Sequence, residues 1–102
     1  HEELPSTGPV LGLFSDLEIE ESEPIQIQPG ELIFLPTDGI EEARAANGKL
    51  FGKERMVSEL SGHETKSVSA TLDHVFAAAQ EFSGDNPQMD DMTAVGLRRA
   101  AP

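Results

Sequence analysis

Acidic residues stand at two points of the sequence where they could carry chemistry. Asp38 comes just after an apolar run, and Asp90 with Asp91 comes just before another. Carboxylate oxygens are the hard ligands that suit Mg²⁺ or Mn²⁺. Such ions lower the pKa of a bound water and align it for attack on a phosphoryl group. Both acidic positions also have a purely structural explanation. An Asp before Gly is often a helix N-cap, and an Asp pair before a strand often forms a turn.

Three segments before Asp38 are predicted to be strands. Leu17–Glu20 and Pro24–Gln28 alternate apolar with polar residues, which is typical of half-buried strands. Glu31–Leu35 is a nearly continuous apolar run, and we expect a central strand that is covered on both faces.

The residues after Asp38 are predicted to form helices and a last strand. The helices are expected over Ile40–Ala46, Lys53–Leu60 and Ser67–Phe82, and the last of these carries apolar residues at three-and-four spacing. Met92–Leu97 is predicted to be the final strand. The fold class is therefore α+β with an antiparallel sheet. If the final strand returns beside the central one, Asp38 and the acidic pair meet at one end of the sheet.

Composition limits the classes of function. The chain has 102 residues, with 7 Lys and Arg against 19 Asp and Glu, which gives a formal net charge of -12. That charge disfavours nucleic acid and anionic lipid as partners, because both bind cationic side chains. No apolar run is long enough to insert into a membrane. The 0 cysteines exclude disulfides and fit a cytoplasmic location.

Four segments resemble, in order and spacing, motifs of the PPM-type metal-dependent serine/threonine protein phosphatases, most closely the bacterial SpoIIE branch. They are similar to that family's "G-x-P-L-G" segment, its apolar strand with "TDG" and "EA", its "N-G-x-x-F-G-x-x-R" segment and its "DDMT" segment. In this sequence they are Gly8–Leu13, Gly30–Ala43, Asn47–Arg55 and Asp90–Thr93.

The resemblance implies a fold and a set of metal ligands. Residues 1–102 would be the C-terminal part of a PPM-type αββα sandwich, with the N-terminal half of the domain absent. Asp38 and Asp90 would be ligands in a centre of two Mn²⁺ or Mg²⁺ ions. Asp91 would support a ligand or bind an accessory ion. No side chain of this chain is assigned a catalytic role.

The resemblance also implies an activity and partners. Members of the family hydrolyse phosphoserine or phosphothreonine on proteins with a bridging water and without a phosphoenzyme intermediate. Typical substrates of the SpoIIE branch are anti-sigma-factor antagonists, and the phosphatase is often fused to a sensor or receiver domain. A chain of half the domain exposes sheet that the other half would cover, so we expect it to associate with that half or to form a homodimer.

The sequence departs from the family at two points. Pro36 stands where the family usually has Tyr, and the family's "D-x-x-G-H-G" element with its further acidic ligand is absent. The two-ion centre is therefore incomplete, and we expect this chain to be inactive alone. The alternative is a regulatory module that keeps the phosphatase fold without catalysis. A Ca²⁺-binding domain is disfavoured because no D-x-D-x-D-G loop occurs.

Other candidate residues have simpler explanations. His74 lies off the apolar stripe of its helix and is expected to be solvated, whereas His63 follows Gly62 in a loop. Acids in the first turn of a helix are favoured by its dipole, which is the explanation for Glu41 and Glu42. Further expectations are a loop anchored by Phe51, packing of Met89 and Met92 beneath the acidic pair, and a solvated tail at Arg98 and Arg99.

Overall fold

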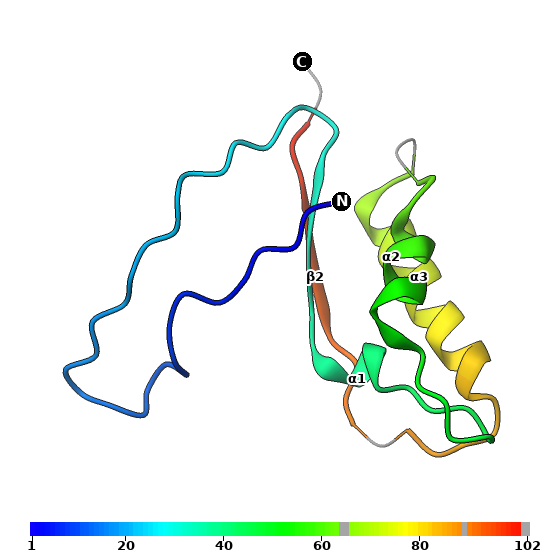
Figure 1. Ribbon diagram of the computed structural model, residues 1–102. Helices are drawn as coiled ribbons and strands as arrows, with labels where there is room; N and C mark the ends of the chain where they lie inside the picture. Colours follow the sequence, from blue (N-terminus) through cyan, green and yellow to red (C-terminus); the bar gives the residue numbers. More distant parts are fainter. Residues whose placement is uncertain (64–65, 89, 101–102) are drawn as a thin grey trace.

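Two strands and three helices follow one another in a simple order along the chain. The computed structural model describes residues 1–63, 66–88 and 90–100. The elements are β1 (Leu32–Pro36), α1 (Asp38–Glu41), α2 (Gly52–Leu60), α3 (Val68–Ser83) and β2 (Ala94–Arg98). Figure 1 shows the two strands side by side, with the helices packed on one side of them. The α+β class expected from the sequence is confirmed.

The last strand returns to the central one, as predicted. β1 and β2 are antiparallel, and their register pairs Phe34 with Gly96 and Pro36 with Ala94. Gly96 does not interrupt the strand. A Cβ added there would lie 2.7 Å from a methyl group of Val68, so the glycine lets α3 pack closely on the sheet.

The helices enclose a small core between themselves and the sheet. The helices α2 and α3 cover nearly the ranges predicted from apolar spacing. The hydroxyl of Ser67 caps α3 by accepting a hydrogen bond from the backbone N–H of Ala70 at 3.1 Å. Burying one large apolar side chain in such a cluster contributes about 1.5–3 kcal/mol. Its buried members are Ile40, Ala43, Phe51, Met56, Val75 and Ala79.

Phe51 anchors the loop before α2, as expected. Its side chain is only 3% exposed, and its ring meets that of Phe82 edge-on at 5.6 Å between centroids. The guanidinium of Arg55 lies 4.6 Å from the centroid of the Phe82 ring and donates hydrogen bonds to the carbonyls of Leu50 and Phe51. The loop is therefore held to both longer helices.

The helix predicted over Ile40–Ala46 is wrong in its extent, because α1 ends at Glu41. The chain then turns into a short hairpin, in which Arg44 forms a β-bridge with Leu50. The N–H of Phe51 donates to the carbonyl of Ala43 at 2.7 Å, and this bond across the hairpin takes an acceptor that a longer helix would use. Asn47 and Gly48 form the turn of the hairpin and do not cap a helix.

The strands predicted at Leu17–Glu20 and Pro24–Gln28 are absent, and no regular element forms before β1. Figure 1 shows this segment as a wide extended loop away from the helices. A strand needs a partner strand for its backbone groups, and within the described residues β1 pairs with β2 alone. The ion pair between Lys53 and Glu3, at 2.7 Å, connects the segment to α2. The hydrogen bond that Lys53 donates to the carboxylate of Glu3 raises the pKa of Lys53.

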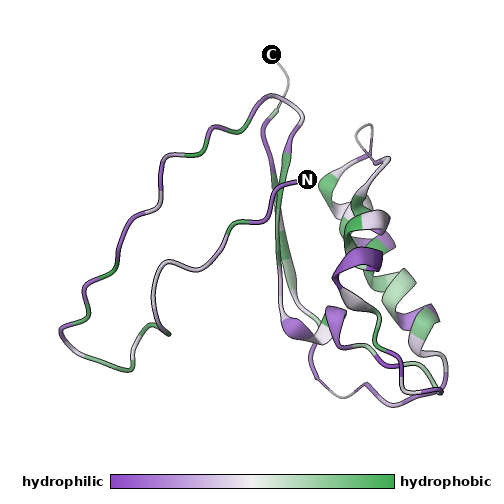
Figure 2. Ribbon diagram, in the orientation of Figure 1, coloured by the Kyte–Doolittle hydropathy of each residue, from purple (hydrophilic) through white to green (hydrophobic). Residues whose placement is uncertain are grey.

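β1 is not covered on both faces, which corrects the prediction for Glu31–Leu35. The face toward the helices carries Phe34, whereas the opposite face carries apolar side chains that remain exposed. Figure 2 shows that both strands are hydrophobic. We call this opposite side the outer sheet face; its exposed large side chains are Leu35 at 59%, Val95 at 56% and Leu97 at 61%.

Candidate metal centre

The two acidic turns meet at one end of the sheet, as the sequence predicted. β1 ends beside the start of β2, and the N–H of Thr37 donates to the carbonyl of Thr93 at 2.8 Å. The hydroxyl of Thr37 donates toward the carbonyls of Asp91 and Thr93, each at 3.2 Å, and accepts from the N–H of Thr93 at 3.0 Å. Thr37 and Asp91 are 54 positions apart in the sequence, so these bonds join two distant segments.

Gly39 brings the two turns into direct contact. A Cβ added at Gly39 would lie 2.1 Å from the carbonyl oxygen of Asp91 and 3.3 Å from that of Asp90. Both distances are to backbone atoms, which cannot move aside as a flexible side chain can. Only glycine therefore allows the start of α1 to lie against the Asp90–Asp91 turn.

The carboxylate of Asp38 is not engaged in capping its helix. Asp38 is the first residue of α1, the N-cap is Thr37, and no side chain makes a cap hydrogen bond. The side chain of Asp38 is exposed, and it takes part in no hydrogen bond within the described part of the chain. The N-cap explanation for Asp38 is therefore wrong.

Asp90 and Asp91 make different contacts. Both side chains are exposed, and one carboxylate oxygen of Asp90 accepts a hydrogen bond from the N–H of Asp91 at 2.8 Å. The backbone of Asp91 contacts α1, as described above. Met92 is partly buried against the core beneath this turn, as expected, whereas Met89 lies outside the described residues.

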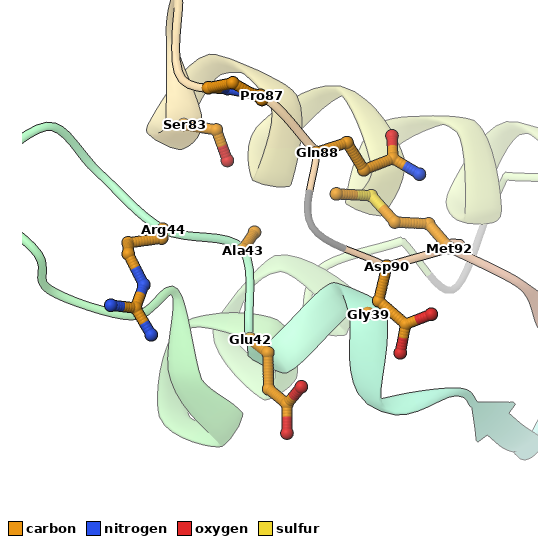
Figure 3. Close-up of a pocket in the computed structure, with 9 residues that line it drawn as sticks. All are labelled: Gly39, Glu42, Ala43, Arg44, Ser83, Pro87, Gln88, Asp90 and Met92. Atoms are coloured by element: carbon orange, nitrogen blue, oxygen red, sulfur yellow. The ribbon is translucent and has the colours of Figure 1, made fainter.

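A shallow hollow adjoins the acidic turns, with space for about one water-sized sphere. Figure 3 shows the guanidinium of Arg44 and the carboxylate of Asp90 on opposite sides of it, pointing away from one another. Glu42 was expected in the first turn of a helix, but it is the C-cap of α1, whereas Glu41 does lie in the first turn. The hollow is lined by Gly39, Glu42, Ala43, Arg44, Ser83, Pro87, Gln88, Asp90 and Met92.

The carboxylates are too few for a complete metal centre. Within residues 1–63, 66–88 and 90–100, no three Asp, Glu or His side chains gather closely enough to hold a metal ion. Exposed carboxylates at a fixed turn nevertheless fit the oxygen donors that Mn²⁺ and Mg²⁺ prefer. The residues present therefore fit part of such a centre, with other ligands required from elsewhere.

The histidines lie away from these turns. His74 is not simply solvated, because one of its ring nitrogens lies 2.5 Å from a carboxylate oxygen of Glu59. His63 is buried, and its ring lies 4.4 Å from that of His74. Arg98 does not end in a solvated tail either, since its guanidinium donates to the carbonyls of His63 and Lys66. These side chains hold the α2–α3 connection to β2.

Comparisons with known proteins identify the family. The family model of stage II sporulation protein E (SpoIIE) matches residues 1–100, so the chain belongs to this family. The SiaA-PP2C domain of Pseudomonas aeruginosa has a similar structure, with a TM-score of 0.66 and 28% sequence identity; the match covers 72% of this chain and 31% of that one. The resemblance to PPM-type, PP2C-like phosphatases is thereby confirmed.

A curated relative is similar over almost all of this chain. Protein IcfG of Synechocystis sp. is 30% identical over an alignment of 99 residues, and the match covers 94% of this chain and 15% of that protein. The chain thus spans a minor part of both relatives.

No helix in the described ranges has the length and apolar character needed to cross a membrane.

Proposed function

We propose that this chain forms part of a metal-dependent phosphatase that hydrolyses phosphoserine or phosphothreonine on a protein. Asp38 and Asp90 are ligands of a centre of two Mn²⁺ or Mg²⁺ ions, and Asp91 supports a ligand or binds an accessory ion. The observation that supports this proposal most strongly is the meeting of the two acidic turns, where Thr37 and Gly39 hold them together.

The ions, when bound, supply a water of lowered pKa near neutral pH for attack on phosphorus. The residues of this chain provide negatively charged carboxylates at the position where the ions would bind. The carboxylate of Asp38 is free of competing hydrogen bonds within the described chain, and the bond from Asp91 N–H orients the carboxylate of Asp90. A carboxylate held in place like that of Asp90 loses little freedom when it binds a cation.

The centre is completed by a part of the domain that residues 1–102 do not contain. The "D-x-x-G-H-G" element of the family is missing from the sequence, and the described residues hold no cluster of three candidate ligands. We therefore propose that this chain is the C-terminal part of the domain and that the N-terminal half supplies the other ligands.

The isolated chain should show no Mn²⁺-dependent hydrolysis of a phosphoserine peptide above the rate in buffer, whereas the full-length protein should be active. Release of inorganic phosphate, measured for both proteins at equal concentration, tests this difference. Turnover by the isolated chain that Asp38→Ala abolishes would contradict the proposed division of the centre. Inactivity of the full-length protein with either metal would instead favour a regulatory module without catalysis.

The substrate and location proposed here rest on family resemblance. An anti-sigma-factor antagonist is the proposed phosphoprotein, and a sensor or receiver domain upstream is the proposed regulator. A cytoplasmic location agrees with a sequence of 0 cysteines.

The isolated chain is expected to self-associate through the outer sheet face. Val95 and Leu97 are 56% and 61% exposed on the same face of β2, and such apolar sheet surface favours pairing. Sedimentation velocity should detect a dimer that Val95→Glu and Leu97→Glu together dissociate. Leu11→Glu is the matched control, because Leu11 is 72% exposed and lies outside the sheet. A monomeric chain at all concentrations would contradict the expected homodimer.

A further inference from the structure

The loop between α3 and β2 carries the acidic pair, and its described residues, 84–88 and 90–93, form no regular element. One end of the loop continues from α3. The other end is held against Thr37 and Gly39, as described above. The part between these ends must also be held if Asp90 is to keep a fixed position.

The side chain of Asn86 ties this loop to the hairpin that follows α1. Its amide nitrogen donates a hydrogen bond to the carbonyl oxygen of Arg44 at 2.9 Å, across 42 positions of the sequence. Within the described residues, no other hydrogen bond joins the loop to residues 43–51. The Asn86 amide is therefore the polar link between these two segments.

The acceptor of this bond is itself fixed in the fold. Arg44 forms an antiparallel β-bridge with Leu50 at the base of the hairpin. Its neighbour Ala43 is buried in the core and accepts a hydrogen bond from the N–H of Phe51 at 2.7 Å. Backbone pairing and a buried neighbour thus hold the carbonyl of Arg44 in place.

The donor is restricted as well, because Asn86 stands directly before Pro87. The proline ring fixes its own φ at about −65° and disfavours the helical conformation for the residue before it. The N–H of Asn86 also donates to the carbonyl of Ser83 at 3.1 Å. The chain from Asn86 to Asp90 therefore has fewer backbone rotations than a loop without proline.

This bond joins the two walls of the hollow beside the acidic turns. The lining residues from positions 39–44 form one wall, and those from positions 83–92 form the other. Figure 3 shows Ala43 and Pro87 on these opposite walls. The place of Asp90 relative to α1 therefore depends on how the two walls are held together.

We propose that Asn86 is a positioning residue of the metal centre. Its bond to the carbonyl of Arg44 sets the place of Asp90 relative to Asp38, and Asn86 itself touches neither the ions nor the substrate. This inference rests on the proposed function, because it assumes that the two carboxylates bind metal ions. Loss of groups that orient metal ligands commonly weakens metal binding about 10–100-fold.

The test is a titration of the full-length protein with Mn²⁺, with the electron paramagnetic resonance signal of free Mn²⁺ as the readout. Asn86→Ala and Asn86→Asp should each weaken Mn²⁺ binding about 10-fold. Ala removes the donor, and Asp replaces it with a carboxylate of similar size that cannot donate to a carbonyl. Asn86→Gln should recover part of the loss, because it keeps an amide donor on a longer side chain.

Asn47→Asp is the matched control, because it makes the same change of amide to carboxylate at an exposed position of the hairpin. Within the described residues, the Asn47 side chain only accepts a hydrogen bond, from the N–H of Lys49 at 3.0 Å. Asp can accept this bond too, so the Mn²⁺ affinity of this variant should equal that of the wild type.

Hydrogen exchange of the metal-free protein separates a positioning role from a general loss of structure. The amides of the loop between α3 and β2 should exchange faster in Asn86→Ala than in the wild type. The amides of α3 should exchange at the wild-type rate, because local opening of a loop leaves the packed helix closed.

Two results would overturn the proposal. One is wild-type Mn²⁺ affinity in both Asn86→Ala and Asn86→Asp, when circular dichroism shows that the variants are folded. The other is an equal loss of affinity in Asn86→Asp and Asn47→Asp, which would indicate an effect of charge and not of position.

Phosphate release from a phosphoserine peptide by the same wild-type sample separates this inference from the proposed function. An active protein whose Mn²⁺ affinity does not depend on Asn86 refutes only the inference. Mn²⁺ binding that depends on Asn86, in a protein that releases no phosphate, refutes only the function.

Discussion

Replacing Gly39 by Ala should separate the two acidic turns and remove most activity from the full-length protein. The new Cβ would lie 2.1 Å from the carbonyl oxygen of Asp91, and one of the two backbones must move. Overpacking of this kind costs about 1–3 kcal/mol of stability. A misplacement of about 1 Å at a reacting centre costs about 100-fold in rate. We therefore expect kcat to fall far more than the folded fraction.

The measurement pairs kcat for a phosphoserine peptide with a thermal melt. Gly8→Ala is the matched control, because a Cβ at Gly8 would meet only a methyl group of Ile19 at 3.6 Å, an ordinary contact. Gly39→Ala with wild-type kcat and wild-type melting temperature would show that α1 and the Asp90–Asp91 turn need not touch.

Asp38→Asn and Asp90→Asn should each lower kcat/KM of the full-length protein by at least about 100-fold. Loss of groups that merely support metal ligands already costs about 10–100-fold, and these two are proposed to be the ligands themselves. Asn keeps the size and the hydrogen-bonding ability of the side chain but removes its charge. Asp91→Asn should have a smaller effect, because Asp91 is assigned a supporting role.

The stability of the Asp38 and Asp90 variants should be unchanged. Both side chains are exposed, and Asn at position 90 can still accept the hydrogen bond from Asp91 N–H. Asp73→Asn, an exposed acid on α3, controls for the change in net charge. Equal activity in Asp38→Asn and Asp73→Asn would remove Asp38 from the metal centre.

The sheet pairing and the longer helices were predictable because local pattern and tertiary packing agree. The apolar spacing in α3 faces the same core that β1 and β2 face, and Ser67 caps the helix where the pattern begins. That the two acidic turns come to the same end of the sheet follows from the antiparallel pairing of β1 with β2. Local consistency of this kind is what makes a fold predictable from its sequence.

Other features depend on contacts that no local pattern reveals. The early end of α1 results from the bond between Phe51 N–H and the carbonyl of Ala43, and the expected early strands lack a partner among the described residues. The proximity of Gly39 to Asp91 and the place of Arg44 beside the hollow depend on where the loop after α3 lies. Such long-range arrangements override local propensity.

Mn²⁺ binding by the full-length protein tests most directly whether Asp38 and Asp90 belong to one metal centre. The measurement is a titration with Mn²⁺ of the wild type, Asp38→Asn, Asp90→Asn and the double variant. The electron paramagnetic resonance signal of free Mn²⁺ is the readout. The effects of substitutions within one centre are not additive. We therefore predict that each single variant weakens one site and that the double variant adds little to that loss. Wild-type Mn²⁺ affinity in both single variants would contradict the account.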